Sequence, residues 1–247
     1  MRDFDLEAQD NDGRLYNYNV DTLFRNLMLR DFSPFIDTRS GERSLEIGSY
    51  DGSMTEQILH YVENLTVVEP SIELANKLNI RFEGRVEVIN STIENFNTHE
   101  KFSNIFLVHT LEHVDNPVLV LSQIKNLLTP RGRVFIAVPN ANALSRQIAV
   151  HMGLISHNSA VLESERNQGH LRTYSMDTLR RDILSASLSI ELLSGVFLKA
   201  LANFQLDTAL REKIISQDYI EAANSLAKIF PDYSASLIAV CSSHSIR

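Results

Sequence analysis

Cysteine is almost absent from this chain of 247 residues, since Cys241 is its single example. One cysteine cannot form a disulfide within the chain, and it cannot supply the several thiolates of a cysteine-based zinc site. Cys241 falls in a late apolar run, where a lone cysteine usually behaves as a small hydrophobic side chain. We therefore expect a buried residue that only fills space.

Long hydrophobic runs are also missing from the sequence. No apolar stretch approaches the roughly 20 residues that a membrane-spanning helix needs. The segment from Met1 to Gly13 is polar and acidic, and it lacks the basic start and apolar centre of a secretory signal peptide. We therefore expect a cytoplasmic protein without a membrane span.

Positive charge is scarce as well. Lysine and arginine number 23 against 31 aspartates and glutamates, which gives a formal net charge of −8. A general nucleic-acid surface needs clustered basic side chains, so nucleic acid is a disfavoured partner. Hydrophobic residues make up 44% of the chain, enough for the core of an α/β protein. We expect a single domain over residues 1–247, in an oligomeric state that the sequence leaves open.

Short apolar runs alternate with longer amphipathic stretches, the pattern typical of strand–helix–strand units in an α/β fold. A Thr-Pro-Arg-Gly turn is predicted at residues 129–132. The predicted strands cover residues 44–47, 65–68, 86–89, 104–108, 134–138, 190–198 and 236–242, and the predicted helices cover 53–61, 72–78, 117–128, 176–186 and 206–230.

Three segments fall outside this alternation. Residues 1–40 precede the first strand and predict one or two helices packed on the domain. Residues 141–174 are too long for a plain connection, and inserts of this length are usually lids or binding loops. Residues 199–233 predict a helical insertion between the last two strands.

A glycine-bearing turn follows the first predicted strand. Its sequence runs from Glu46 to Gly52, with Gly48 between them. Glycine lets the backbone bend sharply and approach a ligand without a Cβ in the way. Such a turn fits a bound nucleotide, but it also fits an ordinary strand-to-helix connection.

Glu69 adds a second feature, since it ends the second predicted strand about twenty residues further on. At this place in a nucleotide-binding unit, a carboxylate accepts hydrogen bonds from ribose hydroxyls. An exposed strand-end carboxylate is the plain alternative. Together, the turn and Glu69 predict an adenosine at the carboxyl edge of the sheet.

The kind of nucleotide follows from what the turn lacks. A dinucleotide site wants glycine at the middle position of its motif, where Tyr50 stands here. The acid Glu46 before the turn suits an amino group and a sulfonium better than a pyrophosphate. These features favour S-adenosylmethionine (SAM) over a nicotinamide dinucleotide.

Four motifs follow one another along the sequence: Glu46-x-Gly48-x-x-x-Gly52, Val68-Glu69-Pro70, His109-Thr110-Leu111-Glu112-His113-Val114-Asp115-Asn116-Pro117 and Leu128-Thr129-Pro130-Arg131-Gly132. Taken in order, they resemble class I SAM-dependent methyltransferases, and most of all the bacterial group that includes the ubiquinone-biosynthesis O-methyltransferases. The resemblance covers residues 41–140 well and extends more loosely through residues 169–174 to the end. It implies a Rossmann-like three-layer sandwich, whose seven-stranded sheet is mostly parallel with an antiparallel last strand.

The resemblance also implies a set of cofactor-binding residues. The first turn would line the methionine part of SAM, Glu69 would hold the ribose, and the segment after the third strand would border the adenine. Two residues just past the fourth strand would lie near the sulfonium. The implied set is Glu46, Gly48, Ser49, Gly52, Glu69, Ser91, Thr92, Ile93, His109 and Leu111.

Histidines gather in the third motif, where His109, Glu112 and His113 share one side of a helical turn. Some relatives, including enzymes that methylate the 3′ ends of small RNAs, place Glu-x-x-Glu-His here with a later histidine and bind a divalent metal. His170 is the matching later histidine, and His109 replaces the first glutamate. These four residues could hold Zn²⁺, Mn²⁺ or Fe²⁺. Alternatively, His113 or His170 acts as a general base, or the cluster only shapes the loop.

We expect a SAM-dependent methyltransferase that acts on a small polar or glycan-like acceptor, at a hydroxyl. Several polar side chains of residues 141–174 favour a polar acceptor. Asn203 and Gln205 at the same sheet edge could bind it, or they could only cap the loop that enters the next helix. The alternatives are an N-methyltransferase of a small metabolite and a SAM-binding protein without catalysis. A nicotinamide-linked enzyme is disfavoured.

Overall fold

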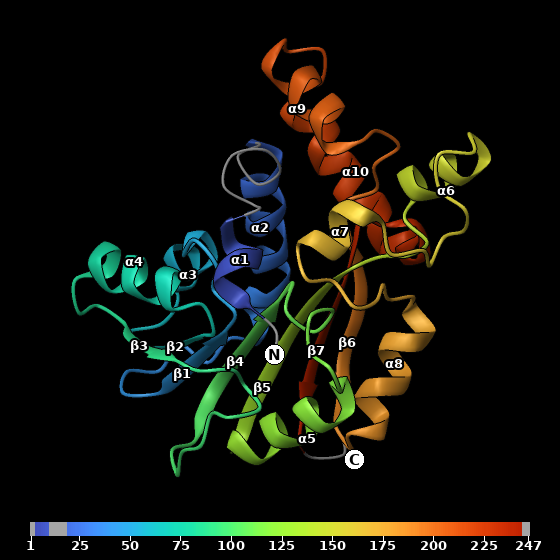
Figure 1. Cartoon of the computed structure of the whole chain (residues 1–247). Helices are drawn as coiled ribbons and strands as arrows, with labels where there is room; N and C mark the ends of the chain where they lie inside the picture. Colours follow the sequence, from blue (N-terminus) through green and yellow to red (C-terminus); the bar gives the residue numbers. More distant parts are fainter. Residues whose placement is uncertain (1–2, 10–18, 244–247) are drawn as a thin grey trace.

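A central sheet organises the chain (Figure 1). The computed structural model describes residues 3–9 and 19–243. In these residues seven strands pair in the order β3-β2-β1-β4-β5-β7-β6, and β7 alone runs antiparallel to its neighbours. This order confirms the predicted Rossmann-like α/β sheet with an antiparallel last strand. The strands are β1 (Arg43–Ile47), β2 (Asn64–Glu69), β3 (Glu87–Asn90), β4 (Phe102–Val108), β5 (Leu128–Pro139), β6 (Ser189–Val196) and β7 (Ser236–Ser242).

Helices cover both faces of the sheet and complete a three-layer sandwich (Figure 1). Apolar side chains of α5 and α8 fill the core on one face, and those of α2, α3, α4 and α10 fill it on the other. The helices are α1 (Phe4–Gln9), α2 (Asn19–Phe32), α3 (Ser53–Ile58), α4 (Ile72–Phe82), α5 (Pro117–Leu127), α6 (Leu144–His151), α7 (Glu163–Asn167), α8 (Met176–Ser185), α9 (Asn203–Arg211) and α10 (Gln217–Ile229).

The central strands β4, β5 and β7 carry continuous apolar runs because both of their faces are covered. Successive side chains alternate between the faces, so Ile105 joins one core and Phe106 joins the other. Phe106 stacks on Phe135 of the neighbouring strand with ring centroids 4.8 Å apart, and Phe32 of α2 packs edge-on against Phe135. Cys241 of β7 is fully buried, which confirms the burial expected for the lone cysteine.

Two sequence predictions about these elements are wrong. The predicted turn at residues 129–132 lies inside β5, where the pairing with β4 shifts register between Phe102 and Asn104. The predicted helix over 206–230 is two helices, α9 and α10. The break has a local cause, because Lys213 takes a left-handed φ of 56° and the Ser216 side chain then caps α10.

The chain before β1 contributes α1 and α2, while residues 10–18 lie outside the described residues. Asp5 of α1 accepts hydrogen bonds from the Ser71 hydroxyl at 2.6 Å and from the backbone N–H of Glu73 at 3.2 Å. This contact fixes α1 at the start of α4. In the described ranges, 3–9 and 19–243, no helix is both long enough and apolar enough to cross a bilayer. The cytoplasmic location predicted from the sequence stays a prediction.

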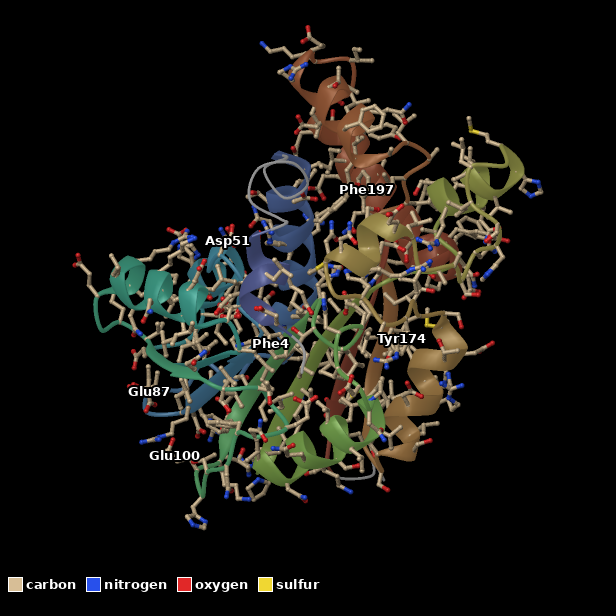
Figure 2. The ribbon with its side chains drawn as sticks, viewed as in Figure 1. Phe4, Asp51, Glu87, Glu100, Tyr174 and Phe197 are labelled. Carbon is tan, nitrogen blue, oxygen red and sulfur yellow. The ribbon has the colours of Figure 1, made fainter. Side chains whose placement is uncertain are left out.

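Residues 141–174 contain α6 and α7 and fold back on the end of β4. Arg146 of α6 pairs with Glu165 of α7 at 2.7 Å, which holds the two helices together. Arg172 donates to the backbone oxygen of Asp115 at 3.0 Å. Tyr174 is buried beside α8, where its hydroxyl donates to Asp182 at 3.3 Å (Figure 2). The role of this segment as a lid stays a prediction.

Candidate functional site

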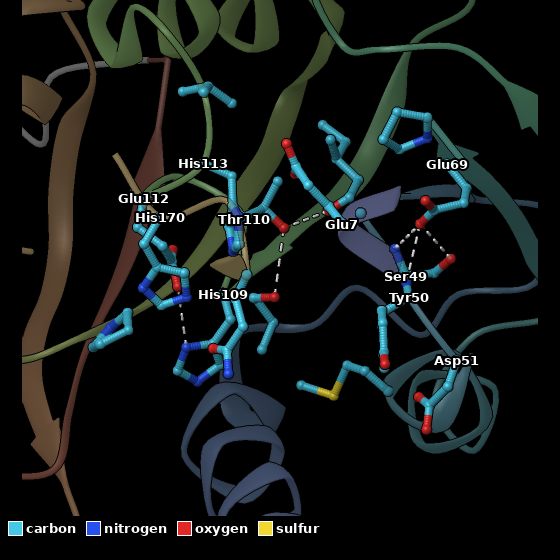
Figure 3. A pocket seen from close by; sticks show the side chains of 18 of the residues that line it. Glu7, Ser49, Tyr50, Asp51, Glu69, His109, Thr110, Glu112, His113 and His170 are labelled. Carbon is cyan, nitrogen blue, oxygen red and sulfur yellow. Dashed lines mark hydrogen bonds and ion pairs between the residues drawn. The ribbon is translucent and has the colours of Figure 1, made fainter. Parts of the chain in front are cut away.

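A cavity of about 480 Å³ opens at the carboxyl ends of β1, β2 and β4, the edge where ligands of open α/β sheets bind. The turn after β1 and the end of β2 form one side of it (Figure 3). The loop after β4 forms the floor, and α1 and α2 cover it. His170, from the segment between β5 and α8, closes the far side.

The glycine turn is built for close approach of the backbone. Gly48 lines the cavity with a φ of +75°, and a Cβ there would lie 2.9 Å from the hydroxyl oxygen of Thr110. Thr110 is held in place because its hydroxyl donates to the backbone oxygen of Ile47 at 2.7 Å. Gly52 has a φ of +77°, but it faces Leu78 at 2.7 Å and does not line the cavity.

Glu69 connects this turn to the end of β2. Its Oε2 accepts hydrogen bonds from the backbone N–H groups of Ser49 at 3.1 Å and Tyr50 at 3.0 Å (Figure 3). Its Oε1 accepts one bond, from the N–H of Ser71 at 3.1 Å. Burial raises the pKa of Glu69, and these hydrogen bonds partly oppose the rise. A carboxylate oxygen accepts more than one hydrogen bond, so Oε1 can also serve a ligand hydroxyl.

Glu46, Gly52 and Leu111 do not line the cavity, although the sequence analysis places them there. The Glu46 side chain lies behind the turn and accepts a hydrogen bond from Thr55 of α3 at 2.6 Å. Burial raises the pKa of Glu46 to about 8. Leu111 is fully buried among the apolar side chains of the core. Both side chains support the loops that carry the site.

The segment after β3 borders the same cavity. Ser91, Thr92 and Ile93 line it as predicted from the sequence position, and their roles toward a cofactor stay a prediction. Gln123 of α5 fixes this segment by donating to the backbone oxygen of Ile93 at 2.8 Å. Glu94 also lines the cavity. Glu94 was not predicted, since no motif in the sequence marks it.

Glu112 lies under the opposite end of the cavity, and its carboxylate is fully buried. Neither of its oxygens has a hydrogen-bond partner among the described residues. An ion-pair contact joins Oε1 to Nδ1 of His109 at 3.4 Å (Figure 3). Burial alone would raise the pKa of Glu112, but the nearby His109, His113 and His170 outweigh it and hold the pKa below its usual value.

His113 and His170 complete this cluster. Their rings meet edge-on with centroids 4.6 Å apart. The ligand atoms of Glu112, His113 and His170 all lie within 4.8 Å of one another, while His109 is outside this group. Burial lowers the pKa of His170, so its imidazole is mainly neutral near pH 7. A buried carboxylate oxygen with two imidazoles fits a divalent cation, and a neutral imidazole also fits a proton acceptor.

The end of the cavity near α9 carries polar side chains that the sequence analysis largely missed. Asn203 lines the cavity, as expected for a residue that could bind the acceptor. Gln205 instead caps α9 by accepting a hydrogen bond from the N–H of Ala202 at 3.0 Å. Asp21 and Lys199 line the cavity beside Asn203. No sequence motif marks them, because they are far apart in the sequence and meet only in the fold.

Comparisons with known proteins agree with this architecture. A family model described as a methyltransferase domain matches residues 16–191. The mitochondrial ubiquinone biosynthesis O-methyltransferase of Schizosaccharomyces pombe is 27% identical over 117 residues, which are 45% of this chain and 43% of that protein. The aligned part thus spans less than half of the curated relative.

Solved structures resemble the whole chain. The N-methyltransferase NodS of Bradyrhizobium japonicum, in complex with S-adenosylhomocysteine (SAH), has a TM-score of 0.59 at 15% identity, covering 96% of this chain and 93% of NodS. A complex of the Haloferax volcanii Trm112 methyltransferase activator with its methyltransferase gives a TM-score of 0.64 at 12% identity, covering 98% and 99%. At these identities the likeness is one of fold.

Proposed function

The chain belongs to the methyltransferase domain family and is a SAM-dependent methyltransferase, and from this premise we propose that it methylates a hydroxyl of a small polar or glycan-like acceptor. One observation carries the proposal: the same cavity has a strand-end carboxylate, Glu69, on one side and a cluster of histidines around Glu112 on the other. The first suits a ribose, and the second suits removal of a proton.

The residues around Glu69 bind the cofactor in this proposal. Oε1 of Glu69 accepts a hydrogen bond from a ribose hydroxyl. Ser91, Thr92 and Ile93 border the adenine. Gly48 lets the methionine part lie against the backbone, since no Cβ fits above Thr110. SAM supplies, when bound, a methyl group on a positively charged sulfur. The chain adds alignment, because displacement at a methyl group depends on placing the acceptor close and in line.

The histidine cluster prepares the acceptor hydroxyl. His113 or His170 takes its proton, and such general-base catalysis contributes a factor of roughly 10²–10⁴ in rate. His170 suits this role because burial lowers its pKa and leaves its ring neutral. Alternatively, Glu112, His113 and His170 hold a divalent metal, which would lower the pKa of a bound hydroxyl. The buried oxygens of Glu112, neither of which accepts a hydrogen bond from a described residue, support this second arrangement.

A methyl-transfer assay tests the proposal. The purified protein is incubated with methyl-labelled SAM and a panel of matched hydroxyl and amine acceptors, with and without the chelator EDTA. We expect labelled product from hydroxyl acceptors. Loss of activity on chelation would assign the metal arrangement, and activity that resists chelation would assign the histidine base.

Two variants sharpen this assay. His170→Asn is expected to lower kcat strongly in either arrangement, whereas His60→Asn, which changes an exposed histidine of the α3–β2 connection, is expected to keep full activity. Product from amine acceptors alone would overturn the choice of a hydroxyl. Absence of any product, with SAH still bound, would favour a binding protein without catalysis.

A further inference from the structure

The end of the cavity beside α9 contains a connected set of polar side chains from distant parts of the chain. Helices α2 and α9 pack against each other there, and both lie near the carboxyl end of β6 (Figure 1). Asp21 comes from α2, Asn203 from α9, and Lys199 from the connection between β6 and α9. All three line the cavity that also holds His109, so this set, the Asp21–Asn203–Lys199 cluster, shares one cavity with the histidine cluster.

A single amide joins the two charged groups of this cluster. The Asn203 side chain donates its Nδ2–H to Oδ1 of Asp21 at 3.1 Å, and its Oδ1 accepts a hydrogen bond from the Lys199 ammonium. The Lys199 ammonium also lies 5.4 Å from the ring centroid of Phe24, a cation–π contact. The amide therefore orients both charged groups toward one part of the cavity.

Part of this cluster has no partner within the protein. Oδ2 of Asp21 is buried, and no described residue hydrogen-bonds to it. A buried acceptor without a donor has lost its hydrogen bonds to water without replacement, so a ligand that donates here gains affinity. Lys199 has three N–H donors, one of which goes to Asn203. The cluster thus offers an open acceptor and further donors side by side.

The chemistry of a hydroxyl group matches this pair. A hydroxyl both donates and accepts, so one hydroxyl, or two on neighbouring carbons, can bind Asp21 and Lys199 together. An ammonium group has no lone pair for Lys199, and a carboxylate has no proton for Asp21. Phe24 adds an apolar wall below Lys199, which suits the C–H face of a ring.

Charge around the cavity gives a second reason to exclude anions. Among the described lining residues, carboxylates outnumber the lysine and arginine side chains, which are Arg25 and Lys199. Asp21 and Glu112 are among these carboxylates, and both would repel an anionic acceptor bound in the cavity. The charge of Lys199 is in turn balanced by Asp21, so the cluster attracts no net charge of either sign.

We propose that the Asp21–Asn203–Lys199 cluster is the acceptor-binding subsite and that it selects a neutral acceptor with hydroxyls on neighbouring carbons, such as a sugar or another polyol. The inference rests on the proposed function, because it places the acceptor in the cavity that binds the cofactor. A free sugar and the end of a larger glycan present the same hydroxyl pair to this subsite.

Saturation-transfer NMR on the SAH-loaded protein tests this subsite with four matched probes: cis-1,2-cyclohexanediol, cyclohexanol, cyclohexanecarboxylate and cyclohexylamine. We expect the diol to give the strongest signal. Lys199→Met removes the ammonium group and Asp21→Asn replaces the carboxylate with a neutral amide. Each variant is expected to weaken diol binding about tenfold. Lys77→Met and Asp218→Asn change exposed side chains in the same way and serve as controls.

The outcomes separate this inference from the proposed function. SAH affinity, measured by calorimetry on every variant, reports both folding and the cofactor site. One set of outcomes has all variants binding SAH normally. If the carboxylate or the amine then binds best, or if neither cluster variant weakens diol binding, the subsite is overturned while the methyltransferase site stands. Binding of none of the four probes would overturn it equally. Failure of the wild type to bind SAH would instead overturn the proposed function and this inference with it.

Discussion

At the scale of single residues, two glycines with the same backbone conformation separate backbone strain from packing. Gly52 has a φ of +77° and Gly84 a φ of +78°. A Cβ on Gly52 would lie 2.7 Å from Leu78 and 2.8 Å from Phe82, whereas a Cβ on Gly84 would meet nothing within 4 Å. The first glycine is therefore needed for both its conformation and its lack of a side chain.

This difference predicts unequal losses of stability. Gly84→Ala is expected to lower the free energy of unfolding by about 1–2 kcal/mol, the cost of a left-handed alanine. Gly52→Ala is expected to cost about 1–3 kcal/mol more, because α4 must also shift. Urea denaturation of the two variants measures the difference. Equal losses would show that α4 accepts the extra methyl group freely.

Glu46 predicts a pH dependence of stability. Burial raises its pKa from 4.5 in the unfolded chain to about 8 in the folded protein. The folded state then binds the proton more tightly, so the stabilisation is complete below the unfolded pKa and is lost as the pH rises through the folded pKa. The contribution of Glu46 to the free energy of unfolding should therefore fall between about pH 4.5 and about pH 8.

Glu46→Gln removes this titration and checks the prediction. The stability of the wild type relative to this variant is expected to fall as the pH rises from near 5 to near 8. Urea denaturation across that range measures it, with Glu163→Gln, an exposed glutamate of α7, as the matched control. If the free energies of unfolding of the wild type and of Glu46→Gln change with pH in parallel, the account is contradicted.

The same residues show what a sequence can predict about a site. Glu69 lies at the cavity as its strand-end position indicates, since the carboxyl ends of parallel strands meet at one edge. Glu46 does not, because its strand position turns the side chain toward Thr55 of α3, a partner that no local pattern reveals. Asp21 and Lys199 were not predicted from the sequence, because they come together only through the packing of α2 against α9.

At the scale of elements, strands were predicted better than helices. Continuous apolar runs mark residues 105–108 of β4, 134–138 of β5 and 237–241 of β7, because helices cover both faces of these strands. The helix predicted over 206–230 failed because apolar residues continue at helical spacing through the break, which depends on the left-handed φ of Lys213. The Pro-Gly signal at 129–132 marks a register shift instead of a strand boundary.

The start of α4 connects element stability to the cavity. The Ser71 hydroxyl caps α4 by accepting the N–H of Leu74 at 3.1 Å, and it also donates to Asp5 of α1. Phe4 and Glu7 of α1 line the cavity. The cap therefore also positions the helix that covers the site.

Ser71→Ala is expected to lower the free energy of unfolding by about 1 kcal/mol and to weaken SAH binding as well. Ser216→Ala is the matched control, because Ser216 caps α10 in the same way, through the N–H of Tyr219, and is far from α1 in the sequence. Its loss of stability should be similar, with SAH affinity unchanged. Denaturation and calorimetry measure the two effects, and an equal fall in SAH affinity for both variants would contradict the role given to α1.

At the scale of the whole molecule, the chain matches the methyltransferase domain family and contains the three-layer sheet. We also predict from its length that the chain folds as a single domain. The effect of bound SAH on thermal unfolding tests the prediction of a single domain. SAH at about 100 times its dissociation constant adds about 2.7 kcal/mol to the stability of the folded state. For a chain of this size that corresponds to a rise of roughly 5–10 °C in Tm.

Differential scanning calorimetry with and without SAH checks this expectation. We predict one cooperative transition that shifts upward as a unit, because the cavity joins α1 and α2 to the ends of β1, β2 and β4. Two transitions of which SAH moves only one would show that the chain unfolds in independent parts.

The most direct test of the central claim, that SAM binds in this cavity with its ribose on Glu69, is calorimetric titration with SAH. We predict micromolar binding by the wild type and by the control Glu163→Gln. Glu69→Gln keeps the size of the side chain but removes its charge, and it should weaken binding about tenfold or more. No binding by the wild type, or binding that Glu69→Gln leaves unchanged, would contradict the account.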